Sequence, residues 1–494
     1  MLTILTTIKQ QQQVIESVNT IERLMELITI TTDKDSIGSA NKSLIIDDSI
    51  YTTLDWNDTE PPYLFPKFSY SQNNLLALLF YKLGNHQRAF DFLEKDSALF
   101  THLLIATNLQ FGYHITAEQI LFLENTSKHN LAIVYNLGEL SSTISKQEIQ
   151  GTYELAIKNE QEDSRILFTV KYYANFLMDN GLNADAEKLI RKVQHKAVSL
   201  DEKNTIHHLL ASALMGQLTI PYAESTLEEI AHLQEKCIAY YNQYQLPINA
   251  GLMLISASEI AGFQKDFAQA KDLIQKAILY FKENDFPDFL GEATLQKATL
   301  LYNWSKNGSP QYYKPAINSY QDALKLFKKE VYPQQFADIH HNLALIYSEI
   351  KVAENEKPIW TAFCASSFKE ALVFYDKNQF PYQYAMVAHN YATALMGFPE
   401  AKLHNNLDKA FNLFEEALII RSAKDYPFER ALTLLNQLEL YWLIHNENTD
   451  EEIKNYEQMI ANANEVTQLV TDTGLIEKAK AHIAELEKIN ISIE

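Results

Sequence analysis

Five prolines divide the second half of the chain into segments of similar length, and this periodicity constrains the fold more than any other feature. The prolines are spaced 40, 46, 48 and 46 residues apart, and a small residue follows each of them four positions later. The positions are Pro247, Pro287, Pro333, Pro381 and Pro427, followed by Gly251, Gly291, Ala337, Ala385 and Ala431. Proline suits the first turn of a helix, where its missing N–H is not needed, so each proline is predicted to begin a helix.

A second amphipathic segment follows each proline-led segment and carries an alanine ten residues before the next proline. These alanines are Ala277, Ala323, Ala371 and Ala417. Small residues at fixed positions allow two helices to pack closely, while large apolar residues at helical spacing form a stripe that packs on a neighbour. No helix pair can bury its stripe alone, so the pairs are predicted to stack in one line.

Shorter versions of the same unit occur in the first half of the chain. One places Ala77, Gly84 and Ala89 at matching offsets, and another does so with Ala174 and Gly181 followed by Ala186. Glycine and proline each number only 13 among 494 residues, which disfavours sandwiches and doubly wound sheets because those folds need many turn residues.

The repeating unit resembles the tetratricopeptide repeat, which has a small residue and an aromatic on its first helix and Ala, aromatic, Ala on its second. Ala344 and Tyr347 match the first helix, and Cys364, Phe368 and Ala371 match the second. The longer units are similar to the repeats of kinesin light chains and of bacterial multi-repeat signalling proteins. The resemblance implies an all-α, right-handed α-solenoid of tetratricopeptide-like helix pairs with extra terminal helices.

The repeats suggest four divisions of the chain. Residues 5–30 are predicted to form one helix, with Val14, Val18, Ile21, Met25 and Ile28 on one face. The divisions are residues 1–68 (this helix plus an extended acidic segment), 69–245 (short-form and degenerate repeats), 246–445 (long-form repeats) and 446–494 (capping helices). The acidic segment, residues 33–68, has a composition that would let it lie across the first repeats.

Charge and composition exclude several classes of function. The net charge is −21 and no block of five basic residues occurs, so neither a nucleic acid nor an anionic membrane is expected as a partner. No run of 18 apolar residues and no secretory signal are present, and Cys237 and Cys364 are expected to be small buried residues. These features favour a cytoplasmic protein. Its oligomeric state stays open.

Catalytic signatures are absent from the sequence. It contains no glycine-rich phosphate loop, no H-E-x-x-H, no C-x-x-C and no G-x-S-x-G. The adjacent pairs His207-His208 and His340-His341 point in different directions on a helix and do not form a metal-binding face. We therefore expect no enzyme activity, no cofactor and no metal site.

Asparagine recurs at one register position, nine residues after three of the prolines. The residues are Asn342, Asn390 and Asn436, and Asn130 fits the same position in an earlier unit. Asparagine is a poor helix-interior residue, so its repeated use suggests a reason. In the resembled family this position faces the concave groove, where a carboxamide can both donate to and accept from a peptide backbone.

The resemblance therefore implies a peptide-binding row of asparagines, with His341, His389, Asp338 and Met386 near the same groove. The alternative is that each asparagine only forms hydrogen bonds within its own repeat. The occupant of the groove would be a protein or peptide partner, or a segment of this chain such as residues 33–68.

Two functions remain open. A third, an enzyme on a helical scaffold, has the least support. The first is a non-enzymatic scaffold or adaptor that binds a peptide or helix of a partner protein in its concave groove. The alternative is a peptide- or effector-gated regulatory protein of a bacterial signalling or defence system, which only the resemblance supports.

Overall fold

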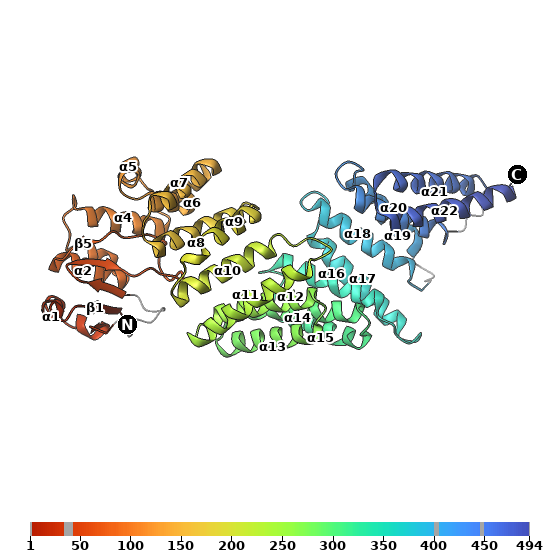
Figure 1. The fold of residues 1–494 in the computed structure, drawn as a ribbon. Helices are drawn as coiled ribbons and strands as arrows, with labels where there is room; N and C mark the ends of the chain where they lie inside the picture. The colour runs from red at the N-terminus through yellow and green to blue at the C-terminus, as the bar shows by residue number, and fades with distance from the viewer. Residues whose placement is uncertain (1, 34–42, 400–404, 445–448, 494) are drawn as a thin grey trace. The chain divides into compact units, whose positions relative to one another are not determined.

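A computed structural model describes the chain except for residues 1, 34–42, 400–404, 445–448 and 494. The chain divides into two compact units, Met1–Asp266 (unit 1) and Phe267–Glu494 (unit 2). Both units consist mainly of antiparallel helices that follow one another along the chain (Figure 1). The sequence predicts a boundary at residue 246 between short-form and long-form repeats. This boundary is defined by repeat length and stays a prediction.

Unit 1 contains five consecutive helix pairs and the first helix of a sixth. We call the first helix of each pair an A-helix and the second a B-helix. The A-helices are α2 (Gln72–Lys82), α4 (Ala98–Phe111), α6 (Lys128–Leu137), α8 (Asp163–Asp179), α10 (Leu200–Met215) and α12 (Pro247–Phe263). The B-helices are α3 (His86–Phe90), α5 (Ala117–Thr126), α7 (Lys146–Asn159), α9 (Asn183–Val193) and α11 (Glu224–Gln243).

A small β-sheet precedes these helices, and the all-α prediction did not include it. Its strand order is β2-β1-β3-β4-β5, with β1 parallel to both β2 and β3 and the remaining pairs antiparallel. The strands are β1 (Leu2–Thr6), β2 (Ile28–Thr31), β3 (Ser43–Ile46), β4 (Ser49–Thr52) and β5 (Phe68–Ser69). All five residues of β1 are buried, as expected for a central strand.

The helix predicted over residues 5–30 is therefore wrong in length. Only Gln11–Asn19 forms an α-helix, α1, in which Val14 and Val18 are buried as expected, and Leu24–Leu27 forms a short 3₁₀ helix. The flanking sequences, rich in threonine and isoleucine, form strands because β-branched side chains pack well on a sheet. Arg23 adopts a left-handed conformation with φ of 63°, which ends any continuous helix before β2.

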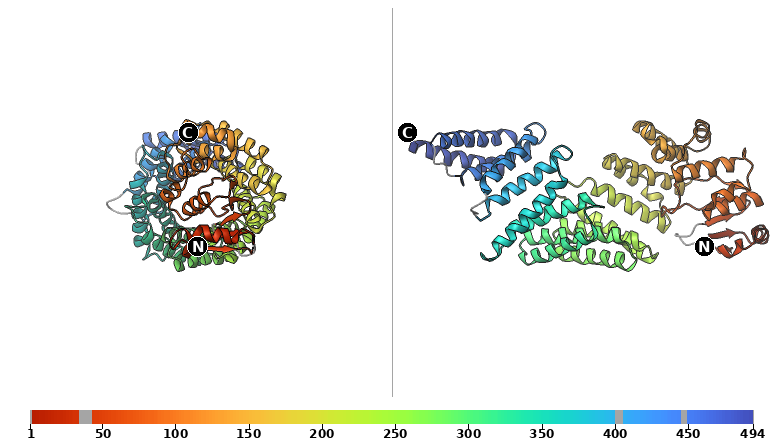
Figure 2. Two further views of the ribbon diagram at one scale, coloured as in Figure 1. Left: turned by 90° about the vertical axis from the view of Figure 1, so that its left-hand side faces the viewer. Right: turned by 180° about the vertical axis from the view of Figure 1, so that it is seen from behind.

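Unit 2 continues the alternation of A- and B-helices and ends in an extra helix. Its B-helices are α13 (Phe267–Glu283), α15 (Tyr313–Leu326), α17 (Lys357–Phe374), α19 (Asn406–Ile420) and α21 (Thr449–Leu469). Its A-helices are α14 (Pro287–Lys306), α16 (Pro333–Glu349), α18 (Pro381–Met396) and α20 (Pro427–Tyr441), and α22 (Thr473–Ile493) follows. Each helix packs on the next one in sequence (Figure 2).

The proline-marked repeat prediction is confirmed in detail. All five prolines occupy the first turn of a helix, at the starts of α12, α14, α16, α18 and α20. The predicted small residues lie at the helix contacts, and those of unit 2 are fully buried, including Ala337, Ala371 and Ala417. The fold is that of a helical repeat protein, with one apolar cluster following another along unit 2.

The surroundings of Gly291 explain why this unit has glycine at the position where three other units have alanine. A Cβ atom at this position would lie 2.8 Å from Cζ of Phe327, whose ring is buried against α14. Such a distance is well inside van der Waals contact, so only glycine fits without displacing the ring.

Within the described residues, no helix is long and apolar enough to cross a membrane.

Candidate functional site

Residues 53–67, which connect β4 to β5, form an extended segment that we call the strap. It lies along the A-helices α2, α4, α6 and α8 of unit 1, and its side chains and main chain are held by residues from all four helices. Tyr63, Leu64 and Phe65 are buried in the main apolar cluster of the unit. The strap thus covers part of the surface formed by these four A-helices.

Asn130 of α6 binds the main chain of the strap at Leu64. Its Oδ1 accepts the N–H of Leu64 and its Nδ2 donates to the carbonyl of Leu64, both at 2.8 Å. Asn130 is fully buried, and the hydroxyl of Ser127 caps α6 by accepting the N–H of Asn130 at 3.2 Å. One carboxamide therefore satisfies the donor and the acceptor of a single peptide residue.

Two histidines hold the two strap residues that precede this contact, Pro62 and Tyr63. His129 Nε2 lies 3.1 Å from the carbonyl of Pro62, and since a carbonyl only accepts, Nε2 carries the proton. The hydroxyl of Tyr63 lies 2.7 Å from Nδ1 of His102 in α4. Burial lowers the pKa of both histidines to about 4, so both are neutral near pH 7.

Two charged pairs anchor the acidic residues of the strap. Lys171 of α8 donates to the carbonyl of Trp56 at 2.9 Å and to Oδ1 of Asp58 at 2.8 Å, and Tyr172 donates to the same carboxylate at 2.6 Å. Two residues further along the strap, Glu60 pairs with Lys82 of α2. The ring of Trp56 packs edge-on against Phe168, with centroids 5.5 Å apart.

The residues that hold the strap share register positions with the predicted row. His129 and Lys171 each lie three residues before the small residue of their helix, the position of His341 and His389 in unit 2. Asn130 lies two residues before that small residue, the position of Asn342 and Asn390, and Asn436 holds the same position before Leu438. His129 of α6 and Lys171 of α8, each three residues before the small residue, donate to main-chain carbonyls of the strap. Sequence reasoning missed them, although their shared register was a usable signal.

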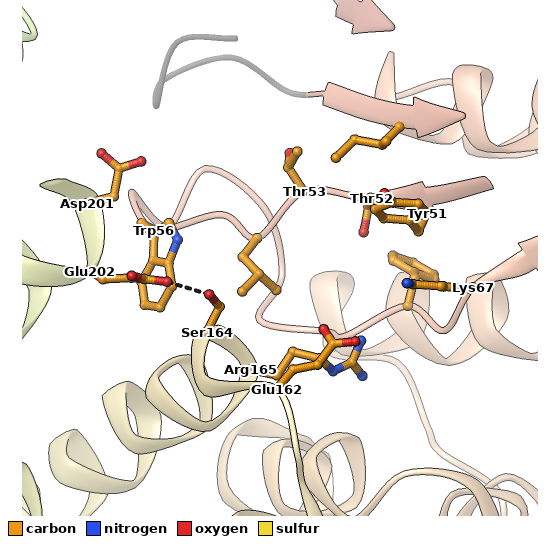
Figure 3. A pocket seen from close by; sticks show the side chains of 13 residues that line it. Tyr51, Thr52, Thr53, Trp56, Lys67, Glu162, Ser164, Arg165, Asp201 and Glu202 are labelled. Atoms are coloured by element: carbon orange, nitrogen blue, oxygen red, sulfur yellow. Dashed lines mark hydrogen bonds between the residues drawn. The ribbon is translucent and has the colours of Figure 1, made fainter. Parts of the chain in front are cut away.

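A cavity of about 490 Å³ lies between the strap, the β3–β4 hairpin and the first turns of α8 and α10. Figure 3 shows Trp56, Asp201 and Glu202 on one side of it and Tyr51 and Lys67 on the other. Glu202 already accepts from Ser164 Oγ at 2.5 Å and from two main-chain N–H groups, and Lys67 lies over the ring of Tyr51. Because these charges have structural partners, we assign no ligand to this cavity.

In unit 2 the structure brings two of the predicted asparagines into contact with two of the predicted histidines. Asn390 Nδ2 lies 2.9 Å from His341 Nε2, and Asn436 Nδ2 lies 3.3 Å from His389 Nε2 and 2.9 Å from Oγ1 of Thr393. Each contact joins one A-helix to the preceding A-helix. The asparagines therefore link successive repeats, an arrangement that neither sequence-based alternative described.

The remaining predicted residues differ from one another in their surroundings. Asp338 accepts the hydroxyl of Tyr375 from the neighbouring B-helix, so this carboxylate has a structural partner. Asn342 and Met386 are half-buried on A-helices, and within the described residues the side chain of Asn342 has no hydrogen-bond partner. Asn342 therefore differs from Asn390 and Asn436, whose carboxamides are hydrogen-bonded to the preceding A-helix.

Burial is the main cause of the pKa shifts of His341, His389 and the two cysteines. It lowers the pKa of His341 to about 4 and that of His389 to about 3, with Arg421 lowering the pKa of His389 further. The thiols of Cys237 and Cys364 are fully buried, and burial raises the pKa of each to about 12. Among the described residues no group of three or more histidine, cysteine or acidic side chains is placed to hold a metal ion.

Comparisons with known proteins concern the fold only. No protein-family model and no curated protein matches the chain. Similar solved structures include the apo form of the quorum sensor NprR from B. thuringiensis (14% identity, 73% of this chain and 97% of that chain, TM-score 0.43). They also include the APC/C hetero-tetramer Cut9-Hcn1 (12%, 85% and 87%, 0.31) and Naa15/Naa10 bound to HypK-THB (12%, 85% and 86%, 0.21).

The helix pairs and their buried small residues are the evidence for a helical repeat fold. Cys364, Phe368 and Ala371 are each fully buried at the B-helix positions where the repeat signature places a small residue, an aromatic and an alanine. Ala344 is likewise fully buried on the partner A-helix. The chain has the fold of a helical repeat protein.

Proposed function

We propose that this chain is a non-enzymatic interaction protein whose A-helices bind an extended segment of a partner protein through its main chain. The observation that carries the proposal is the pair of hydrogen bonds between Asn130 and Leu64. It is an example, within this chain, of an A-helix asparagine holding an extended peptide. Main-chain recognition of this kind gives affinity, while neighbouring side chains give specificity.

Unit 2 supplies the proposed surface for an external partner. It repeats the same register with Asn342, Asn390 and Asn436, and no strap from the described part of unit 2 covers them. His341 and His389 are neutral near pH 7 because burial lowers the pKa of each. The proposed binding row also includes Asp338 and Met386, and its asparagines and histidines would hold a peptide by hydrogen bonds between uncharged groups.

A photo-crosslinking experiment tests the proposal in the full-length chain. A benzophenone amino acid is placed at Met386, one turn before Asn390 on α18, and in a second protein at Val373 of α17, which is 64% exposed on a B-helix. We expect a specific partner to be crosslinked from position 386 and not from position 373. Adding Asn342→Ala should reduce the yield about tenfold, the effect of one lost hydrogen bond.

Two outcomes contradict the proposal. One is equal crosslinking from positions 386 and 373, which would place the partner elsewhere. The other is an undiminished yield with Asn342→Ala in a protein whose unfolding transition is unchanged. The second outcome would show that the asparagine row does not contact the partner.

The strap favours a second candidate, a peptide- or effector-gated regulatory protein. It covers the A-helices α2 to α8 with contacts of the type that an external peptide would make. If binding elsewhere released the strap, amide hydrogen exchange at residues 60–65 would accelerate when the crosslinked partner is added. Unchanged exchange in the saturated complex would remove this candidate.

A further inference from the structure

Arg421, the residue that follows the last turn of α19, is a buried arginine without a counterion. It is 5% exposed, and among the described residues it forms no ion pair. The chain contains six arginines, of which Arg88 is exposed. The other four are each ion-paired with a glutamate: Arg23, Arg165, Arg191 and Arg430. Arg421 therefore stands apart from the other arginines.

The hydrogen bonds of Arg421 leave one end of its guanidinium unused. Nη1 donates to Oγ1 of Thr433 at 2.7 Å and to the carbonyl of Glu429 at 3.3 Å, both on α20. Nε is fully buried and has no partner. Nη2 also makes no hydrogen bond within the described residues, but unlike Nε it is not fully enclosed. Nη2 is therefore the atom that a ligand can reach.

The acidic side chain closest to this cation does not pair with it. Burial lowers the pKa of the Arg421 guanidinium, and the charge of Glu429 raises it. The carboxylate of Glu429, however, accepts the hydroxyl of Tyr382 at 3.4 Å and forms no ion pair with Arg421. A guanidinium stays protonated in a protein, and burying its charge is costly unless an anion is bonded to it.

Packing of the repeat does not account for an arginine at this position. Arg421 lies four residues after Ala417, and the three preceding units have an aromatic residue at the same offset. These residues, Phe281, Phe327 and Tyr375, are all buried. An aromatic ring therefore fills this place in the other units, and the positive charge of Arg421 is not needed for packing.

The preceding unit shows which group is missing. There the hydroxyl of Tyr375 donates to the carboxylate of Asp338, which lies one residue after the small residue of its A-helix. The equivalent residue on α18 is Met386, whose side chain has no charge. The unit that holds Arg421 thus lacks the carboxylate that its neighbour supplies from the same register.

Arg421 lies beside the proposed binding row. Its partner Thr433 is three residues before Asn436, about one turn of α20. Asn436 in turn contacts His389 of α18. Burial lowers the pKa of His389, and the charge of Arg421 lowers it further, which requires the two side chains to be near one another. A ligand on the row would therefore pass close to the guanidinium.

We propose that Nη2 of Arg421 binds a carboxylate of the partner segment, from an acidic side chain or from the C-terminus. A charge-assisted hydrogen bond of this kind is stronger than one between neutral groups. This inference rests on the proposed function and deepens it, because it assigns an acidic group to the partner at the α20 end of the row.

The first test uses acetate as the probe and Arg421 as its own reporter. Full-length protein labelled with ¹⁵N-arginine contains six Nε–H groups, and the enclosed Nε–H of Arg421 should exchange slowly enough to be observed. Acetate should shift this resonance in a saturable manner, whereas chloride at equal ionic strength should not. Arg430, which is ion-paired with Glu465, is the internal control and should not shift.

Two short peptides then distinguish the sources of the carboxylate. Acetyl-Gly-Asp-Gly-amide carries it on a side chain, and acetyl-Gly-Asn-Gly with a free C-terminus carries it on the main chain. The peptide with the lower Kd identifies the source. Acetyl-Gly-Asn-Gly-amide, which has no carboxylate, should bind at least tenfold more weakly than that peptide.

Variants test the assignment by saturation-transfer NMR with acetate. Arg421→Met should weaken binding at least tenfold, and Arg191→Met, which removes an ion-paired arginine of unit 1, should leave it unchanged. Protection of the buried thiol of Cys364 verifies that unit 2 of each variant is folded. If Arg421→Met does not fold, the titration of the wild-type resonance decides the question.

Acetate has no main chain to bind, so its binding separates this inference from the proposed function. Asn342→Ala should not change it. Loss of partner crosslinking together with a saturable acetate shift would sink only the proposed function. No saturable shift at Arg421, an equal shift with chloride, or full acetate binding by folded Arg421→Met protein would overturn the carboxylate site.

Discussion

The carboxamide of Asn130 is hydrogen-bonded to both main-chain polar atoms of Leu64, a residue 66 positions earlier in the chain. The two residues are 0% and 4% exposed, so water cannot replace either hydrogen bond without opening unit 1. This pair fixes the strap to α6. It is also the clearest indication of how the A-helices recognise an extended chain.

Removing this carboxamide should loosen the strap. Asn130→Ala leaves a buried N–H and a buried carbonyl of Leu64 unsatisfied, at a cost of about 2–4 kcal/mol. We expect amide hydrogen exchange of the segment around Leu64 to accelerate at least tenfold in a mass-spectrometric measurement. Asn125→Ala, an exposed substitution whose amide bonds only its own helix, should leave this exchange unchanged. Equal exchange in wild type and Asn130→Ala would show that the strap is held without this contact.

The two cysteines should report the unfolding of the two units separately. Cys237 lies in unit 1 and Cys364 in unit 2, both fully buried, and burial raises the pKa of each thiol to about 12. Thiolate is the reactive form, so both should react slowly with iodoacetamide in the native protein at pH 8. Asn130→Ala should accelerate labelling of Cys237 and not of Cys364. Rapid labelling of either thiol in native wild type would contradict the burial described above.

Gly291 should not tolerate a methyl group. In Gly291→Ala the new Cβ meets the buried ring of Phe327 at 2.8 Å, and such overpacking costs about 1–3 kcal/mol. Gly151→Ala is the matched control, because no heavy atom lies within 4 Å of its Cβ position in α7 and alanine favours a helix by about 1 kcal/mol. Urea unfolding followed by Cys364 labelling should show destabilisation for Gly291→Ala, with partial recovery when Phe327→Leu is added.

Acidification should destabilise unit 2 through His341. Burial lowers its folded-state pKa to about 4 from an unfolded value of 6.5, so between these values only the unfolded chain binds the proton. The free energy of unfolding therefore falls as the pH is lowered through this window, by up to about 1.4 kcal/mol per pH unit. His341→Asn removes this titration. Between pH 7 and 4.5, wild type should lose about 2 kcal/mol more than the variant, measured by urea unfolding at each pH. Parallel losses would place the acid sensitivity elsewhere.

Asn390→Ala should destabilise unit 2, whereas Asn342→Ala should not. Asn390 donates to His341, which is 6% exposed, so the substitution leaves the imidazole nitrogen without its partner at a cost of about 1–3 kcal/mol. Asn342 makes no such contact among the described residues, and its loss should change stability by less than about 0.5 kcal/mol. Thermal unfolding of the two variants distinguishes the asparagine that links two repeats from the one that does not.

Local sequence sufficed for the helix pairs. Pro333 and Pro381 begin helices because proline in a first turn loses no hydrogen bond, and Ala344 and Ala371 are buried because only small residues let the helices approach. These are properties of residues near one another in the chain. The repeat therefore remains visible without knowledge of the tertiary structure.

The N-terminal sheet could not be derived in the same way. The apolar spacing of Val14 and Val18 is genuinely helical, but it extends only over α1. Whether Leu2–Thr6 is a strand depends on Ile28–Thr31 and Ser43–Ile46 lying on either side of it, and a strand gains its hydrogen bonds only from such distant partners.

The asparagine row was likewise predictable only in part. Its register follows from the sequence, because a helix places residues at a fixed offset from its buried small position on one surface. What each carboxamide binds was decided by the fold: Leu64 for Asn130 and His341 for Asn390. A side chain with both a donor and an acceptor takes whichever polar group the tertiary structure brings within 3 Å, and only the packed chain determines which group that is.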